Sequence, residues 1–280
     1  FHLIGRLIVV FMALLGVFFT YKIAKEMFNR ETGFIAAIIL ALSPLHVKHS
    51  HFVRTDIPSS LFILLTIFVL IKYLNDNQKI WYLFLGAFFG GISVANKYTS
   101  GIVLIPILIV SIYSDIHKTS LKSLIYQTLI LKSHTAISLL SFFLGFFIFA
   151  PFVIIDYANA LNSIKVEART YHLGATGKPG IENYIWYIKG ALRQGIGGIV
   201  IEILAITGMV LMLKNVNLKK IVLMAFPICY FLAIGLSHLR WDRWMIVVFP
   251  FEAIMAGYVI VYITKNLLNC TNHIKCIMAW

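Results

Sequence analysis

The sequence has few charged residues. Asp, Glu, Lys and Arg make up only 12% of its 280 residues, whereas soluble globular proteins have about 25%. Hydrophobic residues make up 60%, and the mean hydropathy is +0.88. This composition excludes a water-soluble globular enzyme and a disordered chain. The three cysteines are too few to define a disulfide framework in so apolar a chain.

Acidic residues are scarcer still. Eleven Asp and Glu face 24 Lys and Arg, which gives a formal net charge of +13. In a soluble chain this excess would suggest nucleic acid as a partner. In a membrane protein it is explained by cytoplasmic loops that collect Lys and Arg and by attraction to anionic headgroups. We therefore predict membrane lipids as partners and no nucleic acid.

Hydrophobic runs separated by clusters of charge predict an all-α, polytopic membrane protein with about nine transmembrane helices. Residues 1–280 are expected to form a single transmembrane domain. A full span needs about 20 apolar residues, and several of these runs are shorter, so tilted or broken helices are expected. The predicted spans lie near residues 3–21, 32–46, 58–74, 80–95, 99–114, 135–155, 196–213, 220–237 and 244–264.

The distribution of Lys and Arg orients these spans. One side of the membrane receives thirteen and the other ten, with Arg6 inside the first span, so the first side is predicted to be cytoplasmic. The cationic residues of the other side stand beside His, Asp, Trp and Tyr. We therefore expect the chemistry on the outer face.

One predicted outer loop, residues 156–195, is long enough to form structure of its own. An apolar stripe at steps of four and three residues predicts a helix lying in the membrane interface. A glycine-rich stretch, 174–180, then breaks it, and a second, aromatic-rich helix is expected over 181–192. The stripe consists of Tyr157, Leu161, Ile164, Ala168 and Tyr171.

The densest polar cluster is the segment 46–58, between the second and third predicted spans. It contains His51, Arg54 and Asp56, and charges at membrane depth are expected to line a polar cavity or reach the interface. The alternative is a basic interfacial loop with a structural Arg–Asp pair. A metal site built on its three histidines is a weaker hypothesis, because their spacing is irregular.

A second cluster lies in the short outer turn 237–244. Arg240 and Arg243 are flanked by tryptophans there and could clamp a phosphate; the alternative is an aromatic belt with an Arg–Asp pair. In the long loop, His172 and Lys178 could contact an anionic headgroup or a sugar, unless that segment is an ordinary interfacial helix.

Two carboxylates, Glu202 and Glu252, lie within predicted spans. Carboxylates inside a membrane are candidates for function, although pairing with an arginine is a structural alternative. Gly86 and Gly90 have the spacing of a close helix contact, and this is the role we predict for them.

Several segments, in this order along the chain, resemble the protein mannosyltransferase and aminoarabinose transferase group of GT-C glycosyltransferases. Each segment is a loose match alone, but their order and spacing together are specific. The segments are Arg6, 21–28, 41–44 with 50–56, 86–98, 151–172, and Arg243 with 248–250.

The resemblance implies an integral membrane glycosyltransferase of the plasma (inner) membrane with its active site on the outer face. Members transfer a sugar, with inversion, from a polyprenyl-phosphate carrier (dolichyl or undecaprenyl) to a protein, lipid or glycan acceptor. A carboxylate acts as general base for the acceptor hydroxyl. In the family this base lies in the first outer loop, so the main base is expected upstream of Phe1 and the chain is expected to be a fragment.

Residue by residue, the resemblance carries over an auxiliary role for Asp56 near the active cavity. Arg54 and Arg243 would bind the donor phosphate, and His51, Arg240, His172 and Lys178 would be further substrate contacts. A divalent metal is compatible with this set, but the sequence does not demand one. The alternative function is a non-enzymatic flippase or transporter of lipid-linked sugars, although the sequence shows no paired repeats with interrupted helices. A third reading is an assembly subunit with a decayed site.

Overall fold

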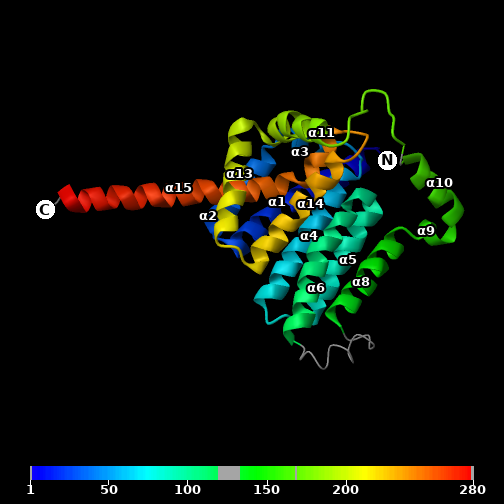
Figure 1. Ribbon diagram of the computed structural model, residues 1–280, viewed down its shortest axis with the longest axis horizontal. Helices are drawn as coiled ribbons and strands as arrows, with labels where there is room; N and C mark the ends of the chain where they lie inside the picture. The colour runs from blue at the N-terminus through cyan, green and yellow to red at the C-terminus, as the bar shows by residue number, and fades with distance from the viewer. Residues whose placement is uncertain (1, 119–132, 168, 279–280) are drawn as a thin grey trace.

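The computed structural model describes residues 2–118, 133–167 and 169–278 (Figure 1). Its regular elements within these ranges are helices, and a single bridge pairs Thr176 with Leu239. The α-helices are α1 (His2–Met27), α2 (Arg30–Ala41), α3 (Pro44–Ser50), α4 (Asp56–Asn75), α5 (Ile80–Asn96), α6 (Leu104–Lys118), α8 (His134–Phe149), α9 (Phe152–Ile155), α10 (Tyr157–Glu167), α11 (Ile181–Trp186), α12 (Arg193–Ile196), α13 (Ile199–Lys214), α14 (Leu218–Gly235) and α15 (Phe249–Met278). Short helices of other types are η1 (Tyr98–Val103), η2 (Tyr187–Leu192) and η3 (Asp242–Val247).

The predicted all-helical membrane fold is confirmed, and each of the nine predicted spans falls on helix. Among the described residues, four helices are long and apolar enough to cross a membrane, or up to six if each of two bent pairs counts as one span. Helices α5 and α8 are apolar but shorter. The number nine therefore stays a prediction.

The bundle is held together by close contacts between helix backbones. Helix α5 packs against α4 on one side and α8 on the other. Gly91 of α5 and Gly145 of α8 leave no room for a side chain, because a Cβ on either would overlap the backbone of the facing helix. The predicted close packing of Gly86 and Gly90 is seen as contacts with Leu70 of α4 and Ile107 of α6.

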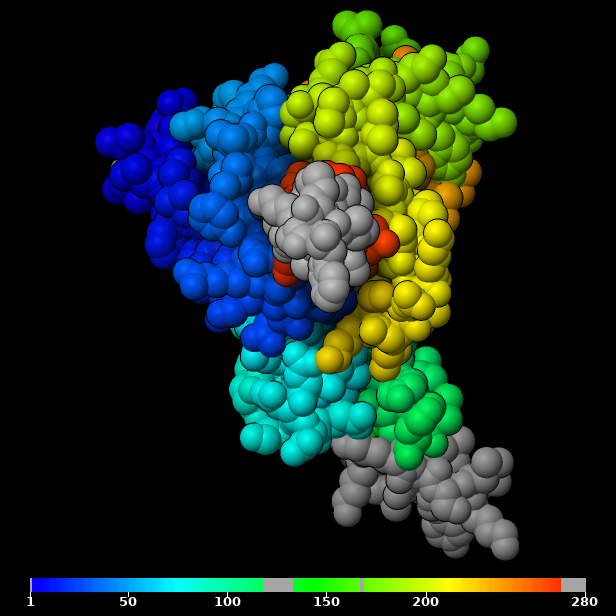
Figure 2. All heavy atoms as spheres, turned by 90° about the vertical axis from the view of Figure 1, so that its left-hand side faces the viewer, coloured from blue at the N-terminus to red at the C-terminus, as the bar shows by residue number. Residues whose placement is uncertain are grey.

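Helix α15 enters the bundle between its two halves. It packs against α2 on one side and α13 on the other, and Figure 2 shows it emerging between the blue N-terminal helices and the yellow helices that follow the long loop. Gly257 and Gly208 permit these two contacts, since they face the backbones of Thr32 and Met255.

Two helix pairs are sharply bent. Helices α2 and α3 meet at 64°, where Pro44 begins α3 and the Ser43 hydroxyl donates to the Gly195 carbonyl at 2.6 Å. The run α11–α12 meets α13 at 107°. Gly197 and Gly198, with φ of 118° and 114°, make this turn, because residues with a Cβ rarely adopt such angles.

The long loop forms the two predicted helical segments. Helices α9 and α10 stand apart from the bundle (Figure 1), and Tyr157 and Leu161 of α10 are exposed, as an interfacial helix requires. Helix α10 ends at Glu167, so Tyr171 lies beyond it and the apolar stripe is shorter than predicted. The second segment begins at Ile181, as expected, and continues through η2 and α12.

Candidate functional site

A buried ion pair lies at the N-terminal end of α4. The Lys97 ammonium donates to Asp56 Oδ1 at 2.7 Å, and the two side chains are only 12% and 4% exposed. Asp56 occupies the first turn of α4, where the helix dipole favours a carboxylate. Lys97 is the residue between α5 and η1. Burial lowers the pKa of the Lys97 ammonium below its ordinary value, and the Asp56 charge opposes this shift.

Arg243 joins this pair from the other half of the chain. It follows Asp242 in η3, which packs against α4. The Arg243 charge lies within electrostatic reach of the Lys97 ammonium. The Arg243 guanidinium stacks on Trp241, with its carbon 4.9 Å from the ring centre, while its Nε is buried without a hydrogen-bond partner. This guanidinium therefore retains donor capacity.

Polar side chains connect the cluster of Asp56, Lys97 and Arg243 to its surroundings. His49 of α3 is buried within electrostatic reach of both Asp56 and Asp242, and its Nδ1 has no partner. Tyr230 of α14 lies 3.5 Å from the Thr99 hydroxyl and near Asp56. Helices α3, α4, α14 and η3 thus converge on one polar region.

The long loop is fastened to the turn before η3. Gly177 N donates to the His238 carbonyl at 2.8 Å, and Arg240 N donates to the Ala175 carbonyl at 2.8 Å. The buried Asn183 side chain donates to the Ser237 carbonyl at 2.6 Å. These bonds place the loop over the polar region.

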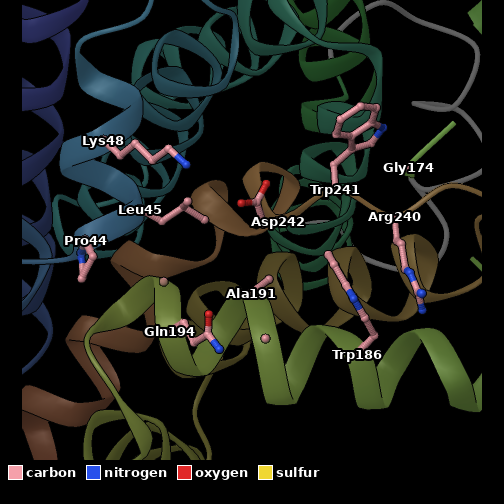
Figure 3. A pocket seen from close by; sticks show the side chains of 12 residues that line it. Pro44, Leu45, Lys48, Gly174, Trp186, Ala191, Gln194, Arg240, Trp241 and Asp242 are labelled. Atoms are coloured by element: carbon pink, nitrogen blue, oxygen red, sulfur yellow. The ribbon is translucent and has the colours of Figure 1, made fainter. Parts of the chain in front are cut away.

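An open cavity of about 620 Å³ lies between α3, the helical run 186–195 and the turn 240–242 (Figure 3). Lys48 and Arg240 approach it from opposite sides, with Asp242 between them. Trp186 supplies an aromatic wall, and its ring is covered by the Arg240 guanidinium at 5.1 Å. Gln194 adds an amide. Cationic, amide and aromatic groups of this kind suit a polar, ring-containing or anionic ligand.

The predicted site residues are divided between three places. Asp56 pairs with Lys97, Arg243 lies within electrostatic reach of that pair, and Arg240 lines the cavity. His172 contacts Trp241 at the cavity rim, with ring centres 5.0 Å apart. Arg54 is exposed, stacks on Phe52 and lines a separate small cavity beside α1.

The other two predicted residues, His51 and Lys178, are exposed. Lys178 pairs with Glu182 at 3.5 Å, and its side chain is 82% exposed. The structure therefore does not place them in the cluster of Asp56, Lys97 and Arg243.

The partner of Asp56 was not predicted from the sequence. An Arg–Asp pair was expected in this segment, but Asp56 pairs with Lys97, 41 residues away, because Arg54 points to the surface. In the sequence, Lys97 stood out only as part of the matched segment 86–98, and His49 only as one of three histidines weighed as a metal site. Within the described residues, no three His, Cys, Asp or Glu side chains are placed to hold a metal ion.

The fold matches known membrane glycosyltransferases. ArnT from Cupriavidus metallidurans bound to undecaprenyl phosphate superposes with a TM-score of 0.62 at 13% identity, over 97% of this chain and 49% of that one. The apo oligosaccharyltransferase of Archaeoglobus fulgidus gives 0.60 at 12% identity, over 99% and 41%; its form tethered to an acceptor peptide gives 0.58 at 13%, over 95% and 39%. The fold is thus that of the GT-C membrane glycosyltransferases.

Sequence comparison identifies the family. The profile of the dolichyl-phosphate-mannose-protein mannosyltransferases matches residues 3–155, which is more than half of the chain. The chain belongs to this family and is an integral membrane protein. It spans about half or less of the length of the solved structures that it resembles. No curated protein sequence matches it significantly.

Proposed function

We propose that the protein transfers a sugar from a polyprenyl phosphate, dolichyl or undecaprenyl, to a protein, lipid or glycan acceptor, with inversion at the anomeric carbon. The observation that carries this proposal is the buried Lys97–Asp56 ion pair with Arg243 within electrostatic reach of the ammonium. The family and the fold support the reaction class.

The cluster suits the leaving group of this reaction. When the bond to the anomeric carbon breaks, negative charge develops on the carrier phosphate, and preorganised cations stabilise it most effectively in a site shielded from water. The Arg243 fork can donate two parallel hydrogen bonds to phosphate oxygens, and Lys97 is a point charge beside it. ArnT, a structural relative, binds undecaprenyl phosphate.

Asp56 has a positioning role in this proposal. The Asp56 carboxylate lies 2.7 Å from the Lys97 ammonium, so Asp56 keeps that ammonium ionised and oriented. A carboxylate engaged in this way is poorly suited to be the free general base for the acceptor. The cavity with Trp186, Arg240 and Asp242 would receive the sugar or the acceptor. We place the site on the outer face of the plasma membrane because the predicted topology puts the cluster there.

The test is sugar transfer in membranes that contain the protein, with radiolabelled dolichyl-phosphate mannose and undecaprenyl-phosphate mannose as donors. Arg243→Gln should lower the rate by about 10²-fold, the effect of removing one donor that stabilises developing charge. Arg30→Gln, an exposed arginine at the start of α2, is the matched control and should keep the wild-type rate. Transfer by the Arg243 variant at the control rate would overturn the phosphate role.

A further inference from the structure

A second cavity lies away from the cluster of Asp56, Lys97 and Arg243, between α13, α14 and the start of α15. It encloses about 340 Å³, and its walls are apolar side chains except for Glu202 and Glu252. Ile206 of α13 and Leu232 of α14, which stand on its walls, are 51% and 50% exposed. In a membrane these exposed side chains face lipid, so the cavity opens sideways into the bilayer.

The two carboxyl groups of this cavity are under-paired. Glu202 is 6% exposed; its Oε2 accepts from Arg193 Nε at 3.1 Å, but its Oε1 is buried without a partner. Glu252 Oε2 is also buried without a partner, and Glu202 lies within its electrostatic reach. Arg193 pairs with Glu202, and among the described residues no ion pair reaches Glu252. Buried polar groups in native proteins nearly always have partners.

Both carboxyl groups lie at the outer level of the bundle. Glu202 is in the first turn of α13 and Glu252 in the first turn of α15, and both helices run inward from the outer face in the predicted topology. Lipid headgroups of the outer leaflet lie near this level, so a lipid beside the cavity would present its headgroup to the carboxylates and its chains to the apolar walls.

We propose that this cavity binds an outer-leaflet phospholipid with a primary ammonium headgroup. The ammonium supplies three donors, which match the unpaired oxygens of Glu202 and Glu252. Its positive charge matches a cavity with two acidic side chains, of which only Glu202 is paired with an arginine, Arg193, in the described part of the chain. The half-buried Arg193, 37% exposed, can face the phosphate of the same lipid. A polyprenyl phosphate has no cation to offer the two carboxylates, so the cavity is distinct from the proposed donor site.

The test uses photoactivatable phospholipids in nanodiscs that contain the protein. Phosphatidylethanolamine, phosphatidylcholine and phosphatidylglycerol carry the same diazirine acyl chain, and labelled peptides are mapped by mass spectrometry. We expect phosphatidylethanolamine to label residues 203–209 and 228–232 at least five-fold more than the other two lipids. Phosphatidylcholine has a quaternary ammonium without N–H donors, and phosphatidylglycerol has no cation.

Two variants and a control make the test specific. Glu252→Gln should reduce phosphatidylethanolamine labelling to the phosphatidylcholine level, and Ile206→Trp should block labelling by filling the cavity mouth with both carboxylates intact. Glu182→Gln, an exposed carboxylate on α11, should change nothing. Equal labelling by the three lipids, preference for phosphatidylglycerol, or labelling that survives Glu252→Gln would overturn the proposal. Sugar transfer is not part of this readout. The lipid-binding proposal can therefore fail while the proposed reaction stands.

Discussion

At the scale of single residues, the site depends on one buried ion pair. Lys97 and Asp56 each lose their water of hydration, and each is compensated chiefly by the other at 2.7 Å. Such a pair adds little net stability by itself, but removing one partner leaves a buried charge without compensation. Arg243 is a second cation near the ammonium. The negative charge of Asp56 offsets the repulsion between these two cations.

Asp56→Asn should therefore destabilise the protein by about 3–5 kcal/mol. Without the carboxylate, burial and Arg243 both lower the Lys97 pKa further. The measurement is the unfolding midpoint in detergent. Arg54→Gln removes a neighbouring exposed charge and should change stability by less than about 0.5 kcal/mol.

A double variant separates this ion pair from simple packing. Asp56→Asn combined with Lys97→Met removes both charges and should recover most of the lost stability, because two apolar or neutral groups leave no charge unpaired. Equal stability of the wild type and the single Asp56 variant would contradict the role given to the pair.

At the scale of helices, the helix ends that carry the polar cluster are positioned by backbone contacts that only glycine permits. Helices α5 and α8 approach so closely at Gly91 and Gly145 that a Cβ would overlap the facing backbone. Helix α5 ends immediately before Lys97, so its placement decides whether the ammonium reaches Asp56.

Gly145→Ala should force α8 away from α5 and cost about 1–3 kcal/mol, as overpacking does. Gly101→Ala is the matched control: nothing lies within 4 Å of an added Cβ there, so its effect should stay within about 0.5 kcal/mol. Thermal unfolding of the two variants in the same detergent compares them. If both are equally stable, the close contact of α5 and α8 does not set the packing.

Sequence periodicity predicted these helices well, because hydrophobic runs and their charged ends are local features. It did not predict the angles at which α2 meets α3 and α12 meets α13, or the pairing of Lys97 with Asp56. Those depend on contacts between distant segments, such as Ser43 with Gly195. Arg240 and Arg243 were recognised as cations near Trp, but only the folded turn shows that Arg240 lines the cavity while Arg243 joins the ion pair.

At the scale of the whole molecule, the proposed reaction requires the cluster of Asp56, Lys97 and Arg243 and the long loop to lie on one side of the membrane. The hydrogen bonds from Gly177 and Arg240 fix the loop to the turn before η3. The turn between α13 and α14 lies one helix away, at the opposite end of α13, and should face the cytoplasm.

Cysteine labelling tests this arrangement in a variant without the native cysteines. Leu173→Cys and Val216→Cys both replace exposed side chains, 83% and 53% exposed. In intact cells a membrane-impermeant maleimide should label position 173 and leave position 216 unlabelled until the membrane is permeabilised. Labelling of both positions in intact cells would overturn the topology.

If Lys97 and Arg243 bind the phosphate of a polyprenyl carrier, the dissociation constant for undecaprenyl phosphate should depend on them. Native mass spectrometry of the purified protein measures it without requiring catalysis. Hydrogen bonds to charged groups contribute about 1.5–3 kcal/mol, so Arg243→Gln should weaken binding at least about 10-fold, while Arg30→Gln should leave it unchanged. Equal affinity of the wild type and a folded Arg243 variant would contradict the account.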